Sequence, residues 1–594
     1  MVQDKFNSRI KEVDKIKEGL KKRINTIATI RLFNFILIVF IAYRYLKVGS
    51  SNLHLYLLLI ATMVLISLVI YHNKLKISLK YANGLILINN QYLDRINGNW
   101  IVFSDFGEDF IDKTHAYSND LDIVGKSSLF QRLNLSHNYI GRKLFAEDLL
   151  NSKYNEEEIL KRQNAIEELG SKLDFIQDLE HASMNTKIQN PGDLISYFEN
   201  SSKSFYTNTI KSILQFSPVL VLGVAAIVIS FQIKPLFILV FILFTLQIML
   251  WLIGLKKNDD ALEKVGLYKN NLEVYLELLK VIELEDFQSP LLKEIKDSLY
   301  SGDSAITAIK KLDMISERIN IKHSGVIYLI LNILFLWDYR SVFALDSWKE
   351  KYGNEVGKWI NSIGQIQSLT SLSVLLQIED KLAFPIIGEE KSIIATSCGH
   401  PLIQIEERIN NNINIKDNIL VITGSNMSGK TTFLRTIGLN LVLLNAGTVT
   451  LSQEFKAPIM KVYTSMRVTD DLKNKISTFY AELLRIKEIL DYGKEHPNAL
   501  FLIDEIFKGT NSKDRILGAK NVLLNLNKLG LMGAITTHDF ELCELDIHPR
   551  IKNYHFAEDY VEGKISFDYK IKKGRSTSTN ARYLMELVGI EFIE

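Results

Sequence analysis

Cysteine and proline are both scarce in this chain of 594 residues, which has 2 cysteines and 9 prolines. The cysteines, Cys398 and Cys543, stand far apart, so the sequence excludes a disulfide framework and a cysteine-rich zinc site. This cysteine usage fits a reducing compartment. The shortage of proline argues against long disordered linkers.

An excess of charge of either sign is lacking as well. The chain has 70 basic and 68 acidic residues, for a net charge of +2. This near-balance gives no bulk electrostatic argument for a nucleic-acid partner or for any other partner. The length predicts about three or four domains.

Long apolar stretches are present, and they come in two pairs. They are Leu32–Leu46 and Leu53–Tyr71, then Ile213–Ile233 and Leu236–Leu255. A helix that spans a membrane needs about 20 mainly apolar residues, which the last three stretches supply; the first is short and contains Arg44. We expect two transmembrane hairpins, at residues 31–72 and 211–257. The alternative is that these stretches are buried core helices of a soluble protein.

Basic residues flank both hairpins and indicate their orientation. They are Lys11, Lys15, Lys17, Lys21, Lys22, Arg23 and Arg31 before the first hairpin, Lys74, Lys76 and Lys80 after it, and Lys256 and Lys257 after the second. By the positive-inside rule the termini and the large middle segments are cytoplasmic, in a multi-pass inner (cytoplasmic) membrane protein with lipid as a partner. Residues 1–30 then form a basic cytoplasmic helix. The first apolar run starts too late for a cleavable signal peptide.

The segments between the hairpins and after them are mostly helical in pattern. Residues 73–100, with turn signals at Gly84 and Asn89, suggest a short β-rich or connecting region. Asn155–Leu169 has apolar residues at helical spacing behind an acidic first turn. Long amphipathic helices, such as Leu262–Ile282 and Ala305–Ile319, indicate levers or struts, although a generic helical domain fits this part equally well.

A glycine-rich motif, G-x-x-x-x-G-K-[ST], begins at Gly424. It follows an apolar strand pattern, Ile419–Ile422, and precedes a helical pattern, Thr432–Leu444. In this setting backbone N–H groups wrap phosphates at the positive end of a helix. Lys430 would reach the β- and γ-phosphates and Thr431 would hold Mg²⁺; the alternative is an ordinary glycine turn. The residues expected to bind ATP here are Gly424, Ser425, Asn426, Met427, Ser428, Gly429, Lys430, Thr431 and Thr432.

Two further strand ends carry chemistry. The apolar run Ala499–Ile503 ends in Asp504 and Glu505, and burying two carboxylates is costly unless they meet a cation or water. We expect Asp504 to hold Mg²⁺ and Glu505 to orient or deprotonate the attacking water. His538 follows another strand pattern, Gly533–Thr537, and would sense the γ-phosphate. The predicted reaction is ATP hydrolysis, with Glu505, His538 and Lys430 as the catalytic residues.

These motifs resemble the ATPase domain of MutS, the mismatch-recognition ATPase of the ABC-type class. The resemblance is carried by TGSNMSGKTTFLR, STFYAEL, LFLIDEIFKGTNSKD, ITTHDFELCEL and the tail FDYKIKKGRSTSTNARYLMELVGI, and more faintly by DLDIVGKSSLFQRLN and EEEILKRQNAIEELG upstream. It implies a homodimer in which Ser477 and Thr478 of one subunit contact the ATP held by the other. It also implies that Asn426 and Met427 lie beneath the nucleotide.

The chain departs from that family at its front. Residues 1–118 hold a basic stretch and an apolar hairpin where the family has a mismatch-binding domain with a Phe-x-Glu wedge, and Lys508 replaces an arginine. We therefore expect a membrane-anchored MutS-like ATPase. A mismatch-repair protein that senses distorted DNA is the alternative, and an ABC-type transport-like machine is a lesser one. DNA binding stays open, because the run Lys11–Arg31 suits anionic lipid equally well.

The expected fold class is multidomain, with transmembrane helical hairpins, a helical MutS-like core or lever domain, and a C-terminal α/β P-loop ATPase domain. The expected segments are 1–30, basic helix; 31–72, first hairpin; 73–210, connecting region and start of the core; 211–257, second hairpin; 258–390, helical core and lever; 391–594, ATPase domain.

Overall fold

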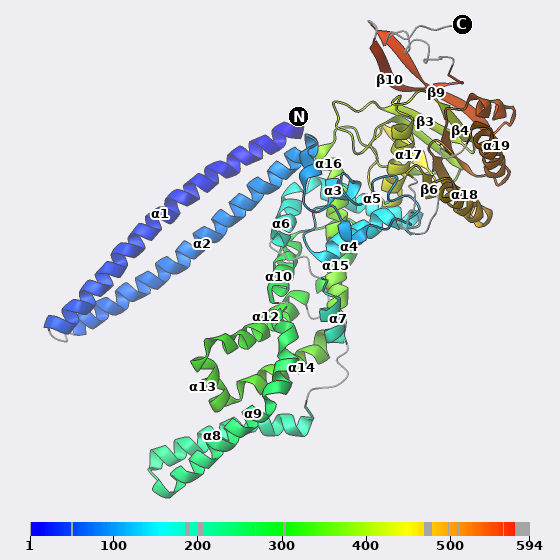
Figure 1. Ribbon diagram of the computed structural model, residues 1–594. Coiled ribbons are helices and arrows are strands. Elements are labelled where there is room, and N and C mark those ends of the chain that lie inside the picture. The colour runs from blue at the N-terminus through cyan, green and yellow to red at the C-terminus, as the bar shows by residue number, and fades with distance from the viewer. Residues whose placement is uncertain are drawn as a thin grey trace.

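The computed structural model describes residues 2–48, 52–151, 153–184, 190–199, 206–267, 269–300, 304–467, 478–496, 498–507, 511–561 and 564–576. Two helical hairpins project from an elongated helical body (Figure 1). The first hairpin leaves the body at the end that carries the α/β domain, and the second leaves it at the opposite end. The N-terminus of the chain lies near the base of the first hairpin, beside the body.

The first hairpin is far longer than its apolar stretches. It consists of α1 (Val2–Val48) and α2 (Asn52–Ile96), which run antiparallel. None of the most apolar window of α1 is buried, and only 6% of that of α2. At the base Phe6 stacks on Tyr92 with ring centroids 4.8 Å apart, and midway Arg31 Nη1 lies 2.9 Å from His72 Nδ1. The apolar stretches therefore occupy the far end of a stalk.

The expectation of a β-rich or connecting region at residues 73–100 is wrong, because α2 continues without a break to Ile96. The apparent turn signals are packing contacts. A Cβ at Gly84 would lie 2.3 Å from the His181 ring, so glycine allows α6 (Leu173–Ser183) to approach closely. Asn89 of α2 is buried and exchanges hydrogen bonds with Gln177 of α6. The composition change at residue 31 likewise marks no break in α1.

The second hairpin consists of α8 (Asn208–Phe231), the 3₁₀ turn η3 (Lys234–Leu236) and α9 (Phe237–Leu267). Gln232 adopts a left-handed conformation, with φ of 51°, and reverses the chain. Among the described residues, four helices are long and apolar enough to cross a membrane: α1, α2, α8 and the η3–α9 segment. These coincide with the four predicted stretches, and the continuous helix gives the first stretch ample length. Membrane crossing itself stays a prediction.

Short helices form the body, which extends from the α/β domain to the second hairpin. They are η1 (Asn99–Val102), η2 (Glu108–Phe110), α3 (Leu129–Leu133), α4 (Tyr139–Leu150), α5 (Glu156–Ser171), α6, α7 (Gly192–Glu199), α10 (Lys269–Leu284), α11 (Pro290–Tyr300), α12 (Ala305–Asn320), η4 (Ile321–Ser324), α13 (Val326–Phe335), α14 (Trp337–Tyr352), η5 (Gly353–Glu355), α15 (Val356–Ser373) and α16 (Leu375–Ile378). The helices predicted at 155–169 and 305–319 are confirmed. Asn155 and Glu158 form a capping box at the start of α5.

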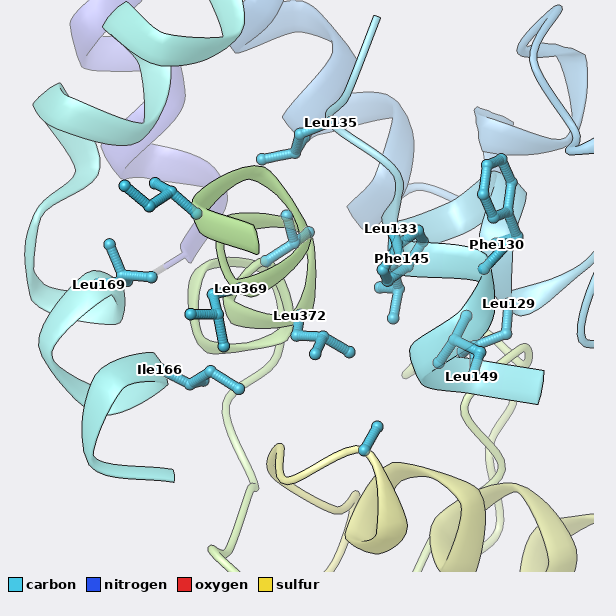
Figure 2. Close-up of a cluster of buried hydrophobic side chains, with 14 of the residues drawn as sticks. Leu129, Phe130, Leu133, Leu135, Phe145, Leu149, Ile166, Leu169, Leu369 and Leu372 are labelled. Carbon is cyan, nitrogen blue, oxygen red and sulfur yellow. The ribbon is translucent and has the colours of Figure 1, made fainter. Parts of the chain in front are cut away.

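Helix α15 is the centre of this body. Figure 2 shows Leu369 and Leu372 of α15 facing apolar side chains of α3, α4 and α5. Both leucines are at most 1% exposed, as is Ile166 of α5. Since apolar burial is the main stabilising term in folding, α15 holds the N-terminal and middle segments together.

A buried ion cluster joins the helical body to the α/β domain. Glu379 Oε1 lies 2.6 Å from Arg132 Nη2 and 2.8 Å from Arg408 Nη2, and all three side chains are at most 7% exposed. Burial raises the pKa of Glu379, but hydrogen bonds from Arg408 and the charge of Arg132 outweigh burial and hold the pKa below its usual value. Burial also keeps nearby His400 neutral, with a pKa of about 3.

We expect Glu379→Gln to destabilise the protein by about 3–5 kcal/mol at neutral pH, because two buried guanidinium groups lose their counter-charge. The native pKa is depressed, so this contribution exists above the unfolded pKa of about 4.3 and is lost as pH falls through the native pKa. Denaturant midpoints at pH 7, and at falling pH values from the unfolded pKa downward, measure it. Exposed Glu406→Gln is the control, and equal midpoints for Glu379→Gln and wild type at pH 7 would contradict the expectation.

The α/β domain contains a six-stranded sheet in the order β10-β9-β4-β8-β7-β6. The strands are β4 (Ile419–Thr423), β6 (Lys461–Ser465), β7 (Ala499–Ile503), β8 (Met532–Thr536), β9 (Ile551–Val561) and β10 (Lys564–Lys573). Only β10 runs antiparallel to its neighbour. Every residue of β4, β7 and β8 is buried, as expected for parallel strands covered on both faces.

Helices α17 (Lys430–Asn445), α18 (Thr478–Glu495) and α19 (Ser512–Lys528) pack against this sheet, and η6 (Phe540–Ile547) follows β8. A second sheet has the order β1-β5-β2-β3, from β1 (Ile386–Ile387), β2 (Ser392–Cys398), β3 (Asn411–Lys416) and β5 (Glu454–Ala457). The sequence patterns described above do not predict this second sheet. The predicted strands at 419–422, 499–503 and 533–537 are confirmed as β4, β7 and β8.

Candidate functional site

The predicted phosphate loop connects β4 to α17. Gly429 has φ of 104°, which an L-residue rarely adopts, and a Cβ there would lie 3.2 Å from the Tyr569 ring. Met427, at the exposed tip of the loop, also has a positive φ of 68°. Lys430 begins α17 and donates to the carbonyl oxygens of Gly424 (2.8 Å) and Ser425 (2.7 Å). The lysine therefore braces the curve of the loop, with its Nζ at the concave side.

The loop has the donor set that a phosphate requires. Ser425 Oγ and Ser428 Oγ are buried, and neither has a hydrogen-bond partner among the described residues. A buried hydroxyl without a partner is costly, and an anionic oxygen would satisfy both. The N-terminus of α17 adds its positive dipole end at the same place. The residues present therefore fit a bound phosphate.

Thr431 and Asp504 lie together, as the sequence predicts. Thr431 Oγ1 donates to Asp504 Oδ2 at 2.8 Å, and Thr536 Oγ1 donates to Asp504 Oδ1 at 2.5 Å. Parallel strands β7 and β8 bring their carboxyl ends to the same edge, which explains why Asp504 meets Thr536. Hydroxyl and carboxylate oxygens are the ligands that Mg²⁺ prefers, so this pair fits the metal.

Glu505 and His538 also lie side by side. His538 Nε2 is 3.1 Å from Glu505 Oε1, and both side chains are partly exposed. Glu505 has φ of 49°, a conformation that costs about 1–3 kcal/mol in a non-glycine residue. Its N–H donates to Thr536 Oγ1 at 2.9 Å, which helps to hold this conformation. In this conformation the Glu505 carboxylate lies beside His538 and is partly exposed.

The structure adds two carboxylates that the sequence analysis missed. Asp120, from the helical body, accepts hydrogen bonds from Thr464 Oγ1 (2.7 Å) and from the Met466 N–H (3.0 Å) at the end of β6. Between them, Ser465 O accepts the Asp504 N–H at 2.9 Å. Asp122 adds an ion pair with Arg435 of α17. The helical body thus contacts both the strand end and the helix that carry the site.

Four of the predicted features fall wholly or partly outside the described residues. Ser477 lies outside them, as does Lys508. Thr478 is the first residue of α18, and only its backbone is described. The closing hairpin of the tail is confirmed as β9 and β10, whereas the helix expected after it lies beyond residue 576.

The sheet is mainly parallel, and a glycine loop joins its central strand β4 to a helix. Asp504 and Glu505 follow β7, which is separated from β4 by β8 alone. These features define a P-loop α/β domain. Residues 420–590 match the family model described as MutS domain V. The chain is 26% identical over 332 residues to the DNA mismatch repair protein MutS of Leptospira interrogans. The aligned segment covers 53% of this chain. It is 30% identical over 215 residues to the protein of the same name from Halalkalibacterium halodurans, or 35% of this chain.

The aligned segments are only a part of each relative. The aligned segment spans 35% of the Leptospira protein and 25% of the Halalkalibacterium protein. The Leptospira match covers more of this chain than residues 420–590 contain, so the likeness continues outside domain V. These comparisons support a MutS-family protein and agree with the resemblance read from the sequence.

Proposed function

We propose that this protein is a MutS-type ATPase anchored in a membrane, which binds and hydrolyses ATP at the β4–α17 loop. The observation that carries the proposal is the hydrogen bond between Thr431 and Asp504, which lies beside the loop braced by Lys430. Phosphate donors, metal ligands and a carboxylate–histidine pair thereby converge on one edge of the sheet. The match to MutS domain V supports the same conclusion.

In this proposal each residue has one task. The loop N–H groups and the Ser425 and Ser428 hydroxyls bind phosphate oxygens, and Lys430 neutralises the β- and γ-phosphates. Thr431 and Asp504 would hold Mg²⁺, which supplies positive charge to the phosphates when bound. Glu505 accepts the proton of the attacking water, and His538 fixes the position of the Glu505 carboxylate. Asn426, Met427 and Thr432 complete the nucleotide surface of the loop.

The MutS resemblance makes a homodimer part of the proposal. In that arrangement Ser477 and Thr478 at the start of α18 contact ATP held by a second copy. Closure of two ATPase domains would be transmitted to the helical body through Asp120 and Asp122, because these residues contact the end of β6 and α17 directly. ATP binding would then move the levers and, with them, the hairpins.

Membrane anchoring is supported by the exposure of the apolar helices. Phe33, Phe40 and Ile60 are more than half exposed, and so are Phe241 and Ile253 of α9. Exposed apolar surface of this extent indicates a lipid or protein partner. The uncharged stretches of α2 and α9 have the length of a membrane span, and cationic residues follow both.

Fractionation of cells in alkaline carbonate tests the anchor. We expect the full-length chain to remain in the membrane pellet, since the cost of exposing two apolar hairpins to water holds them in lipid. A double substitution in the apolar part of α2, Val64→Arg with Ile66→Arg, is expected to weaken retention. Leu284→Arg, a single change at an exposed position at the end of α10 and outside both hairpins, is the control. Release of the wild-type chain into the supernatant would contradict the proposal that the protein is anchored in a membrane.

A DNA mismatch repair function is the second candidate, and the names of the relatives favour it. Here the basic residues of α1 would meet DNA rather than lipid headgroups. A mobility shift with matched and mismatched duplexes at several salt concentrations separates the two cases. Tighter binding to the mismatched duplex would favour mismatch repair.

A further inference from the structure

Helix α13 is a short apolar helix that neither hairpin includes. Its sequence, VIYLILNILF, carries no charge. Four of its aliphatic side chains are about half exposed or more: Val326 (73%), Ile327 (57%), Leu329 (47%) and Ile330 (47%). Adjacent exposed aliphatic side chains of this kind call for a covering partner.

The opposite side of α13 is fixed to the second hairpin. Gln247 of α9 donates to the Ile333 carbonyl at 2.9 Å. Asp338, just after α13, accepts from Trp251 Nε1 of α9 at 3.1 Å and from Tyr328 OH at 2.6 Å. Because these bonds hold one side of α13 against α9, its exposed side has a fixed direction.

The contact points on α9 define a depth. The uncharged stretch of α9 ends at Leu255, and Lys256 and Lys257 follow it. Trp251 and Gln247 precede Leu255 by four and eight residues, which places them about 6 and 12 Å inside the apolar stretch. Helices that lie in a membrane interface bury their apolar face about 5–10 Å deep. The contact at Trp251 falls within this range, and the contact at Gln247 lies about 2 Å deeper.

The chain turns sharply at both ends of α13, so it can enter a bilayer and leave it on the same side. Gly325 (φ 39°) precedes it and Leu336 (φ 51°) follows it, and the next helical segment is bent from it by 75°. Ten residues make a helix of about 15 Å, half of the thickness of the hydrocarbon core. Lys322, which pairs with Asp259 of α9 at 2.7 Å, precedes the helix, and Trp337 follows it; tryptophan is enriched at membrane interfaces.

We propose that α13 inserts into the cytoplasmic leaflet beside the second hairpin without crossing the membrane. Its face formed by Val326, Ile327, Leu329 and Ile330 would contact lipid acyl chains. This inference rests on the proposed membrane anchoring. Acyl chains are the occupant that fits, because α13 is bonded to α9 within the apolar stretch of that helix and the exposed face consists of aliphatic side chains.

Depth-dependent fluorescence quenching tests the proposal in the full-length chain reconstituted into vesicles of phosphatidylcholine and phosphatidylglycerol. Single cysteines at Ile327 and Ile330 are labelled with a polarity-sensitive dye, and doxyl-labelled lipids serve as quenchers. Ile253→Cys on α9 is the membrane reference and Leu517→Cys on α19 the aqueous one; both positions are well exposed. The native Cys398 and Cys543 are at most 2% exposed and contribute little labelling.

We expect the dyes at 327 and 330 to lose fluorescence to at least about half the extent seen at 253, with no loss at 517. Quenching at 253 without quenching at 327 and 330 would overturn the α13 inference and leave the anchoring intact. An absence of quenching at all four positions would overturn the anchoring itself, and α13 with it. Retained Mg²⁺-ATP binding confirms that each labelled protein is folded.

Discussion

Lys430→Ala is expected to lose ATP binding. The Lys430 ammonium is almost fully buried and bonds to two carbonyl oxygens of the loop, so alanine removes both the brace of the loop and the charge that faces the phosphates. We expect an affinity for Mg²⁺-ATP at least about a hundredfold weaker, which corresponds to about 2.8 kcal/mol. Calorimetric titration of the detergent-solubilised protein measures it.

A matched control is available in the same domain. Lys391 is also partly buried and donates to a backbone carbonyl, that of Gly530, but it lies away from the loop. Lys391→Ala should keep the wild-type affinity for ATP. Equal affinity of Lys430→Ala and wild type would show that the loop is not the nucleotide site, and the proposed function would fall with it.

Glu505→Gln is expected to separate binding from hydrolysis. Glutamine keeps the size of the side chain and can still contact His538, but it cannot accept the proton of the attacking water. We expect ATP affinity close to that of the wild type and turnover lower by about 10²–10⁴-fold. Phosphate release measures turnover, and sedimentation tests whether ATP then accumulates a dimer.

The control for this change is Glu541→Gln, an exposed glutamate in η6 near the same edge of the sheet. It should leave turnover unchanged. Normal turnover in Glu505→Gln would remove Glu505 as the base. Slow turnover with equally weakened ATP binding would mean that the strained conformation at residue 505, rather than its proton chemistry, had been lost.

The local parts of the site could be predicted because each lies within a few consecutive residues. Glycine, lysine and threonine at fixed spacing after an apolar strand specify the loop, and β7 delivers Asp504 and Glu505 together. Parallel pairing then brings Thr431, Asp504 and His538 to one edge of the sheet. The roles of these residues in catalysis stay predictions until the variants are measured.

Other parts could not be predicted because their meaning depends on distant partners. Asp120 contacts Met466, which is 346 positions later in the chain, and nothing near Asp120 indicates that contact. Gly84 and Asn89 are residue types typical of turns, but in this protein they lie within α2 and allow α6 to pack closely against it. A single sequence carries no direct signal for contacts of this range.

The length of the first hairpin has a mechanical consequence. Its bonds to the body lie near its base, where Lys5 donates to Gln377, Arg9 pairs with Asp174 and Tyr81 donates to Asp178. About 30 residues of α1 precede its apolar stretch, and they make a rod of about 45 Å. A pivot of about 10° at the base would move the start of the apolar stretch, at the end of this rod, through about 8 Å. The stalk thus amplifies a small rotation of the body into a displacement of about a quarter of the thickness of the hydrocarbon core of a bilayer.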